Sequence, residues 1–401
     1  MSAREDDKHF LSLRSQWDLQ EGVSYLNHGS FGPTPRVVQH ARDEWQRALA
    51  RNPMDFFVRQ MEGLLHSAAE RLGQFVGASA DDLVFVDNAT AGMNVVAATV
   101  ALQPGDEVLL TDHEYGAVRR IWERAALRQG AHVVIRKLPL PLESIEATVD
   151  AFFAGVSPRT RLIVVSHITS PTAVILPVEE ICRQAKERGI PVCIDGPHAL
   201  AIESLDLERL ECEYYTASCH KWLSAPFGSG FLYVRRRAQS AVQPVVVSWG
   251  GSIGGRPASW RDEFHWLGTR DPAPFLAIPT ALDFLETIGW QRFRDRVHSL
   301  ACYARDRITP ITGLDPIIPE DRRWFGSMIA LPVDPGRGNP TGHGRRDPLQ
   351  DALWNRCRIE IPVVWWQGLR MVRVSCHLYT QTGELDLLAD ALRELLPLTT
   401  E

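Results

Sequence analysis

The chain lacks features that mark several classes of protein. Its seven cysteines are odd in number and scattered, with no C-x-x-C pair, which argues against a disulfide framework and a structural zinc site. No Lys/Arg stripe is present, and 43 basic side chains against 49 acidic ones give a net charge of −6. Apolar runs such as 161–166 are too short to span a bilayer, and the charged start over 1–8 is not a secretion signal. We therefore expect a cytoplasmic protein with no metal site and no nucleic-acid or membrane partner.

The order of apolar segments predicts an α/β fold. The 401 residues are 45% hydrophobic and 23% charged, which is ordinary for a globular protein, and the length favours two domains. Short apolar runs that predict strands alternate with longer helical patterns. The strands are expected at 83–86, 107–110, 133–135, 162–165, from 192 and at 231–234, and the helices at 91–100, 117–129, 144–153 and 178–188. Such alternation predicts a parallel sheet covered on both faces.

The flanking segments indicate a helical start and a second domain. Two amphipathic helices are expected over 35–50 and 55–76, and a long ordered loop over 249–274. A helix over 279–288 should begin the second domain, with strands near 327–331 and 371–375. The segment 334–344 is predicted to be a flexible loop; the alternative is a basic phosphate cradle.

A lysine and an acid stand out as candidates for chemistry. Lys221 lies between the polar cluster 218–224 and the small-residue run 225–230, and Asp195 ends the apolar run that begins at Val192. A lysine that can form a Schiff base and an acid at a strand end are two parts that a pyridoxal phosphate enzyme needs. The alternative for Lys221 is a surface lysine beside a glycine-rich loop.

Three further segments follow predicted strands, where an open parallel sheet binds its ligands. Residues 87–92 open a helix and suit a phosphate, or they form an ordinary N-cap. His113 could lie flat on an aromatic cofactor, or be a turn histidine. His198, three residues after Asp195, could reach the phenolic oxygen of the cofactor ring.

Nine segments also carry a resemblance to a known family. The sequence resembles the class V aminotransferase superfamily of fold-type I pyridoxal phosphate enzymes, and within it the isopenicillin N epimerase-like branch. The segments are 26–33, 53–60, 111–117, 166–172, 195–199, 219–223, 268–272, 358–363 and 372–375. The resemblance implies a large domain with a mostly parallel seven-stranded sheet flanked by helices, and a smaller α+β domain. We expect an N-terminal segment over 1–25, the cofactor domain over 26–270 and the small domain over 271–401.

The resemblance also implies a role for individual residues. As catalytic residues it implies Lys221 as the Schiff-base lysine, Asp195 as the partner of the pyridine nitrogen and His113 stacked on the ring. Further cofactor contacts are implied for His198 at the phenolic oxygen and for Ala89, Thr90, Ser218 and His220 at the phosphate. Thr269 resembles a phosphate contact supplied by the second subunit, which implies a homodimer. Arg373 would bind the substrate α-carboxylate, and Asn27, His28 and Tyr115 would lie near the substrate.

One stretch departs from the cysteine desulfurases of this superfamily. Where they carry a nucleophilic cysteine, residues 363–368 contain none. Cys357 lies before a predicted strand at 359–361, and a packed thiol is the favoured interpretation. Trp365 and Trp366 suggest an aromatic wall, although core packing explains them equally well.

We expect an enzyme that acts on a small amino-acid-type substrate and removes its Cα proton with Lys221. An epimerase or racemase is the first hypothesis, in which His28, His113 or Tyr115 supplies or relays a proton on the opposite face. A C–S or other β-lyase and an aminotransferase are the second. A non-catalytic regulator with this fold is a remote third.

Overall fold

The computed structural model describes residues 3–249, 259–334 and 347–399. A seven-stranded sheet has the order β2-β8-β7-β6-β5-β3-β4, and only β8 runs antiparallel to its neighbours, β2 and β7. The strands are β2 Leu83–Val86, β3 Glu107–Thr111, β4 His132–Arg136, β5 Thr160–Ser166, β6 Val192–Asp195, β7 Tyr214–Ser218 and β8 Gly230–Val234. The predicted mostly parallel seven-stranded sheet is confirmed, although β7 was not among the predicted strands.

Helices cover both faces of this sheet because successive strand residues point to opposite sides. In β3, Val108 and Leu110 join an apolar cluster with α5 and α6, while Leu109 joins the other main cluster. That second cluster includes residues of α4, α7, α8 and α12. The bounds are α4 Met61–Val76, α5 Ala89–Thr99, α6 Gly116–Gln129, α7 Ile145–Phe153, α8 Val178–Glu187 and α12 Ile278–Ile288.

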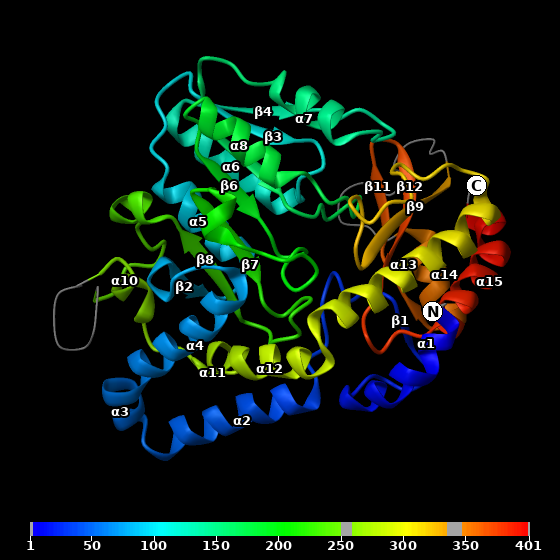
Figure 1. Cartoon of the computed structure of the whole chain (residues 1–401), viewed down its shortest axis with the longest axis horizontal. Coiled ribbons are helices and arrows are strands. Elements are labelled where there is room, and N and C mark those ends of the chain that lie inside the picture. The colour runs from blue at the N-terminus through cyan, green and yellow to red at the C-terminus, as the bar shows by residue number, and fades with distance from the viewer. Residues whose placement is uncertain (1–2, 250–258, 335–346, 400–401) are drawn as a thin grey trace.

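A smaller α+β unit follows, at the right of Figure 1. Its antiparallel sheet has the order β11-β12-β9, and α13 packs against β9 and α15. The bounds are β9 Met328–Asp334, β11 Val363–Trp366, β12 Leu369–Ser375, α13 Trp290–Thr312, α14 Pro348–Cys357 and α15 Thr382–Thr399. The predicted small C-terminal α+β unit is therefore confirmed.

The N-terminal segment packs against this smaller unit. Helix α1 (Ala3–Phe10) contacts α13 and α15, and the N-terminus lies beside α15 in Figure 1. Strand β1 (Ser24–Tyr25) pairs in parallel with β10 (Ile359–Glu360). The division of the chain at residues 25 and 270 stays a prediction.

The two predicted helices before the sheet are α2 (Arg36–Arg51) and a composite element. The helix expected over 55–76 starts earlier, as α3 (Pro53–Asp55), because the Asn52 side chain accepts a hydrogen bond from the Asp55 amide at 3.1 Å. Residues Phe56–Gln60 then widen into a π-helix before α4. The predicted helix over 55–76 is therefore helical throughout, but it begins two residues earlier and includes a π-helical turn.

Two predicted loops lie partly outside the described residues. Of the loop expected over 249–274, residues 250–258 are outside, and the rest includes the short helices α10 (Asp262–His265) and α11 (Ala273–Leu276). Of the loop expected over 334–344, only Asp334 is described, at the end of β9. The remaining short helices are η1 Leu11–Gln16, η3 Ala80–Asp82, α9 Leu207–Leu210 and η4 Arg236–Ala241. Among the described helices, none is long and apolar enough to cross a membrane.

Candidate active site

The predicted lysine and acid meet at the carboxyl edge of the central sheet. Asp195 is the last residue of β6, in register with Ser166 of β5 and Thr216 of β7. Lys221 follows the end of β7 by three residues. Because the carboxyl ends of parallel strands meet at one edge, the fold brings both residues to the position where such sheets bind ligands.

His198 lies between the side chains of Lys221 and Trp222. The Lys221 Nζ lies 3.1 Å from His198 Nε2, and Trp222 Nε1 donates to His198 Nδ1 at 3.3 Å. An indole N–H can only donate, so Nδ1 accepts and a neutral ring carries its proton on Nε2. That proton points at Lys221 Nζ, an arrangement that suits an uncharged amine.

Burial and charge set the protonation of the pair. Burial lowers the pKa of Lys221, the Arg373 cation lowers that pKa further, and Asp195 opposes both. Burial raises the pKa of Asp195, while the Lys221 charge opposes that rise. The charge of each residue therefore offsets part of the free-energy cost of burying the charge of the other.

His113 is held edgewise by threonines and packed against tryptophan. Its Nδ1 lies 2.7 Å from Thr172 Oγ1, and Thr172 Oγ1 lies 2.6 Å from Thr169 Oγ1. The His113 ring centroid is 4.3 Å from that of Trp366. Burial lowers the pKa of His113 to about 3, so the ring is neutral near pH 7. Its Nε2 has no hydrogen-bond partner in the described structure.

His28 lies behind Lys221 and has both ring nitrogens engaged. Its Nε2 donates to the Lys221 carbonyl at 3.0 Å, and Nδ1 accepts from Tyr379 Oη at 2.9 Å. The ring stacks on His377 at a centroid separation of 4.0 Å. Asn27 is also buried, and its Nδ2 lies 3.4 Å from Glu360 Oε1. His28 thus supports the backbone of the lysine.

The candidate phosphate residues gather at the start of α5. Asn88 caps the helix, and the Ala89 amide donates to Ser218 Oγ at 2.9 Å, while Thr90 is exposed in the first turn. A side chain at Gly92 would come within 2.1 Å of Thr216 Oγ1, so glycine permits the helix to approach β7 this closely. The N-terminus of α5 therefore lies beside the sheet edge with its positive dipole end toward the site, although Ser218 and Asn88 already accept from the amides of Ala89, Ala91 and Gly92.

His220 and Thr269 lie around this helix end in different ways. The His220 ring is 5.3 Å from that of Phe227, and its buried Nδ1 has no hydrogen-bond partner in the described structure. Thr269 is exposed in the bend between α10 and α11, and its neighbour Arg270 donates to Asp87 Oδ1 at 3.3 Å. Nothing in the single chain buries Thr269 against the other candidates.

Arg373 enters the site from β12 of the smaller unit. Its guanidinium donates to the Ser170 carbonyl at 2.6 Å and to Ser30 Oγ at 2.7 Å. Burial lowers its pKa to about 10, which leaves it charged near neutral pH. Arg373 and Tyr115 line one pocket of about 390 Å³, together with Ser170 and Trp366.

Sequence reasoning missed three polar residues of this site. Ser30 and Ser170 lie within segments that carried the family resemblance, but only the fold shows that they hold Arg373. Glu114 is buried and accepts hydrogen bonds from the hydroxyls of Thr111 and Ser166, each at 2.6 Å. Burial raises its pKa to about 7, and the two hydroxyls oppose that rise. Its place beside His113, within the segment 111–117 that carried the family resemblance, was the available signal.

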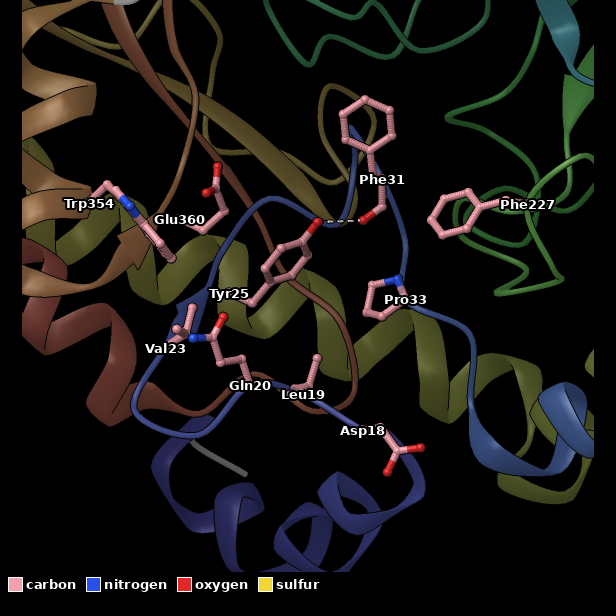
Figure 2. Close-up of a pocket in the computed structure, with 10 residues that line it drawn as sticks. All are labelled: Asp18, Leu19, Gln20, Val23, Tyr25, Phe31, Pro33, Phe227, Trp354 and Glu360. Atoms are coloured by element: carbon pink, nitrogen blue, oxygen red, sulfur yellow. Dashed lines mark hydrogen bonds between the residues drawn. The ribbon is translucent and has the colours of Figure 1, made fainter.

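A second pocket, of about 320 Å³, borders two of these groups without including them (Figure 2): Phe227 in its wall packs on His220, and Glu360 in its wall accepts from Asn27 Nδ2. Tyr25 Oη donates to the Phe31 carbonyl at 2.7 Å, and Figure 2 shows Phe227 projecting toward this segment from a separate loop. None of the predicted site residues lines it. It is therefore not the place where Lys221 and Arg373 meet a ligand.

Unpaired polar atoms test whether the site suits a polar cofactor and substrate. Four predicted residues bury a side-chain atom that has no hydrogen-bond partner among the described residues: Asn27 Oδ1, His113 Nε2, His220 Nδ1 and Arg373 Nε. Such a buried atom costs about 1–3 kcal/mol, so a ligand that supplied the missing partner of any of the four would stabilise the protein. An amine, a buried carboxylate and a helix N-terminus together fit the aldehyde, pyridine nitrogen and phosphate of pyridoxal phosphate.

The chain belongs to the aminotransferase class-V family, whose model matches residues 26–344. Together with the seven-stranded sheet and the smaller α+β unit, this membership defines a fold-type I enzyme. The family indicates pyridoxal 5'-phosphate as the cofactor, in agreement with the fit of the site.

Individual relatives differ in the reactions that their names describe. The chain is 39% identical to isopenicillin N epimerase of Amycolatopsis lactamdurans, over 96% of this chain and 98% of that protein. It is 32% identical to putative L-cysteine desulfhydrase 1 of Oryza sativa subsp. japonica, over 96% of this chain and 85% of that protein. Among solved structures, a C-DES mutant with glycine covalently linked to its pyridoxal phosphate matches with a TM-score of 0.82. That match has 21% identity and covers 95% of this chain and 99% of the other.

Proposed function

We propose that this protein is a pyridoxal phosphate-dependent epimerase or racemase that acts at Cα of an amino acid or an amino-acid-derived substrate. The observation that carries the proposal is that three segments meet at the carboxyl edge of the central sheet: Asp195 ends β6, Lys221 follows β7 by three residues, and the Arg373 guanidinium donates to the Ser170 carbonyl beyond β5. The chain is also 39% identical to an isopenicillin N epimerase over nearly its full length. When bound, the cofactor supplies an aldehyde that condenses with amines and a ring that delocalises the charge left on Cα.

Asp195 would keep the cofactor ring effective. A carboxylate at this position pairs with a protonated pyridine nitrogen, and charge–charge attraction across the pair keeps both groups ionised despite burial. His198, whose Nε2 lies 3.1 Å from Lys221 Nζ, would bind the phenolic oxygen once the lysine moves away.

Lys221 would carry the Cα proton on one face of the substrate. Its lowered pKa means that a larger fraction of the amine is uncharged near neutral pH than for an exposed lysine. The Nε2 proton of His198 favours the same uncharged form, because it needs an acceptor at Nζ.

Arg373 would orient the substrate by its α-carboxylate. The guanidinium fork matches a carboxylate with two parallel hydrogen bonds. Ser30 and Ser170 hold the fork in place from two separate segments, and both hydroxyls can rotate to admit the ligand. A fixed carboxylate leaves Cα in one position relative to Lys221.

An epimerase also needs a proton donor on the face opposite Lys221. His28 is a weak candidate because both ring nitrogens are already engaged. His113 has an unpaired Nε2, and Tyr115 lines the pocket that contains Arg373. We propose Tyr115 or His113 for this second role.

A C–S lyase is the second candidate function. The 32% identity to a putative cysteine desulfhydrase favours it. The lyase would share Lys221 and Arg373 and differ only after the Cα proton has left. Cys219, next to His220, is fully buried, and burial raises the pKa of its thiol, so it is a poor nucleophile.

The test is turnover of candidate amino acids in deuterated water. We expect exchange of the Cα hydrogen and formation of both configurations, with no keto acid, ammonia or sulfide. Lys221→Ala should abolish exchange, while Lys137→Ala, at an exposed position, should leave it unchanged. Release of a keto acid would support the lyase instead, and conversion of the cofactor to its amine form would support an aminotransferase. Turnover with full retention of the Cα hydrogen would exclude all three.

A further inference from the structure

The two tryptophans of β11 have separate environments. Trp365 Nε1 donates to Asp347 Oδ2 at 2.6 Å, and its ring lies 5.8 Å from the Arg370 guanidinium carbon. Trp366 Nε1 donates to the Asp112 carbonyl at 3.0 Å. Successive strand side chains point to opposite faces, so Val364 shares the face of Trp366. Trp365 is therefore a packing residue of the smaller unit, whereas Trp366 faces the active site.

Val364 and Trp366 line the 390 Å³ pocket that contains Arg373. Trp366 is fixed at both ends, by its hydrogen bond to Asp112 and by the His113 ring 4.3 Å away. Pro171 and Tyr115 also line this pocket. The pocket thus has one apolar wall, of Val364, Trp366 and Pro171. Its remaining lining is mostly polar and includes Asp112, Glu114 and the guanidinium groups of Arg119 and Arg373.

We infer that this pocket receives the side chain of the amino-acid substrate, and that the substrate class is amino acids whose side chain has several carbons and an apolar body. The inference rests on the proposed function, because Arg373 must hold the α-carboxylate. Pockets of about 300–1,000 Å³ are the size that proteins use for small organic ligands. A one-carbon side chain would leave the apolar surface of Trp366 and Val364 exposed to water.

Trp366 and Val364 are then specificity-determining residues. A wall fixed by two contacts keeps its shape when a ligand enters, so the ligand gains contact without reorganising the protein. The Trp366 ring also restrains His113, which couples the side-chain pocket to the ring-stacking position.

The experiment is a binding series on the purified holoenzyme. L-Alanine, L-2-aminobutyrate, L-norvaline and L-norleucine are titrated, with affinity measured from the absorbance of the bound cofactor and by calorimetry. Affinity should rise up to about fourfold with each added methylene, as expected for full burial of each group.

Two variants of one residue test the pocket directly. Val364→Trp, which fills the pocket, should abolish the rise in affinity along the series. Val364→Ala, which enlarges the pocket, should weaken norleucine binding more than alanine binding. Leu127→Trp, at an exposed position of α6, controls for the added indole and should leave the series unchanged.

The outcomes separate this inference from the proposed function. An absorbance change with every ligand but equal affinity across the series would overturn the inference and leave the proposed function standing. No absorbance change and no heat with any amino acid would count against the proposed function itself. An unchanged series in Val364→Trp would place the side chain elsewhere and also overturn the inference.

Discussion

At the scale of single residues, burial decides which groups are charged. His28, His113 and His198 are all buried, and burial lowers the pKa of each, so they are neutral hydrogen-bonding groups near pH 7. Lys221 differs because a carboxylate and a guanidinium act on it in opposite directions. The reactivity of this lysine is therefore a property of its surroundings, which substitution can change.

The pH dependence of Lys221 reactivity measures these surroundings. In the cofactor-free protein, acylation of Lys221 should begin at lower pH than acylation of the exposed Lys8 and Lys137, because its lowered pKa yields free amine earlier. The chain has only four lysines, so mass spectrometry can follow each one.

Two neutral substitutions should move this profile in opposite directions. Arg373→Gln removes a cation that lowers the pKa, so the Lys221 profile should shift to higher pH. Asp195→Asn removes the carboxylate that raises the pKa, so the profile should shift to lower pH. A Lys221 profile that overlaps those of the exposed lysines would contradict the buried pair.

At the scale of elements, the smaller unit is tied together by one buried acid. Asp347 caps α14 by accepting from the Leu349 amide at 2.8 Å, and it accepts from the Trp365 indole. It also accepts from Arg370 Nε at 3.0 Å, and the Asp347 and Arg370 side chains are almost fully buried. The acid thereby links α14, β11 and β12, and β12 carries Arg373.

Asp347→Asn should destabilise the protein by about 3–5 kcal/mol, because it leaves the Arg370 charge buried without its partner. Urea unfolding should show the loss as a lower midpoint. Asp390→Asn breaks an exposed pair with Arg393 and should cost less than about 1 kcal/mol. The double variant Asp347→Leu with Arg370→Met should recover part of the lost free energy of unfolding. Equal losses in Asp347→Asn and Asp390→Asn would refute the linking role.

At the scale of the whole molecule, the site draws on segments far apart in the sequence. Ser30 follows β1, Ser170 follows β5 of the central sheet, and Arg373 lies on β12 of the smaller unit. Thr269 is exposed in the single chain. Its predicted contact with the phosphate of a second subunit would complete the site, so we propose a homodimer.

Mixed dimers test the second subunit directly. Lys221→Ala and Thr269→Ala should each lose or weaken cofactor binding as separate proteins. When the two are unfolded together and refolded, each mixed dimer should regain one intact site, with Lys221 from one chain and Thr269 from the other. A fully active monomer in light scattering, or no recovery despite mixed dimers, would refute the shared site.

The sequence by itself determined the layered fold and the residues at the strand ends. Strands that are apolar on both faces, separated by helical patterns, indicate a covered parallel sheet, and Asp195 follows from where one of its predicted strands ends. Lys221 was indicated instead by its place between the polar cluster 218–224 and the small-residue run 225–230. Strand β7 escaped prediction because it ends in Thr216, Ala217 and Ser218. The polar side chains of this strand are satisfied only by tertiary partners, such as the Phe231 carbonyl that accepts from Thr216 Oγ1.

Only the tertiary structure decided which candidate residues hold other residues in place and which face the active site. From the sequence, His28, His113 and Tyr115 were equally good candidates for the second proton donor. Trp365 and Trp366 were equally good candidates for an aromatic wall. The fold turns His28 to the Lys221 carbonyl and Trp365 to Asp347, while Trp366 faces His113. The partner of Trp365 lies 18 residues away in the chain and that of His28 lies 193 away, and local patterns carry no information about which partner a side chain meets.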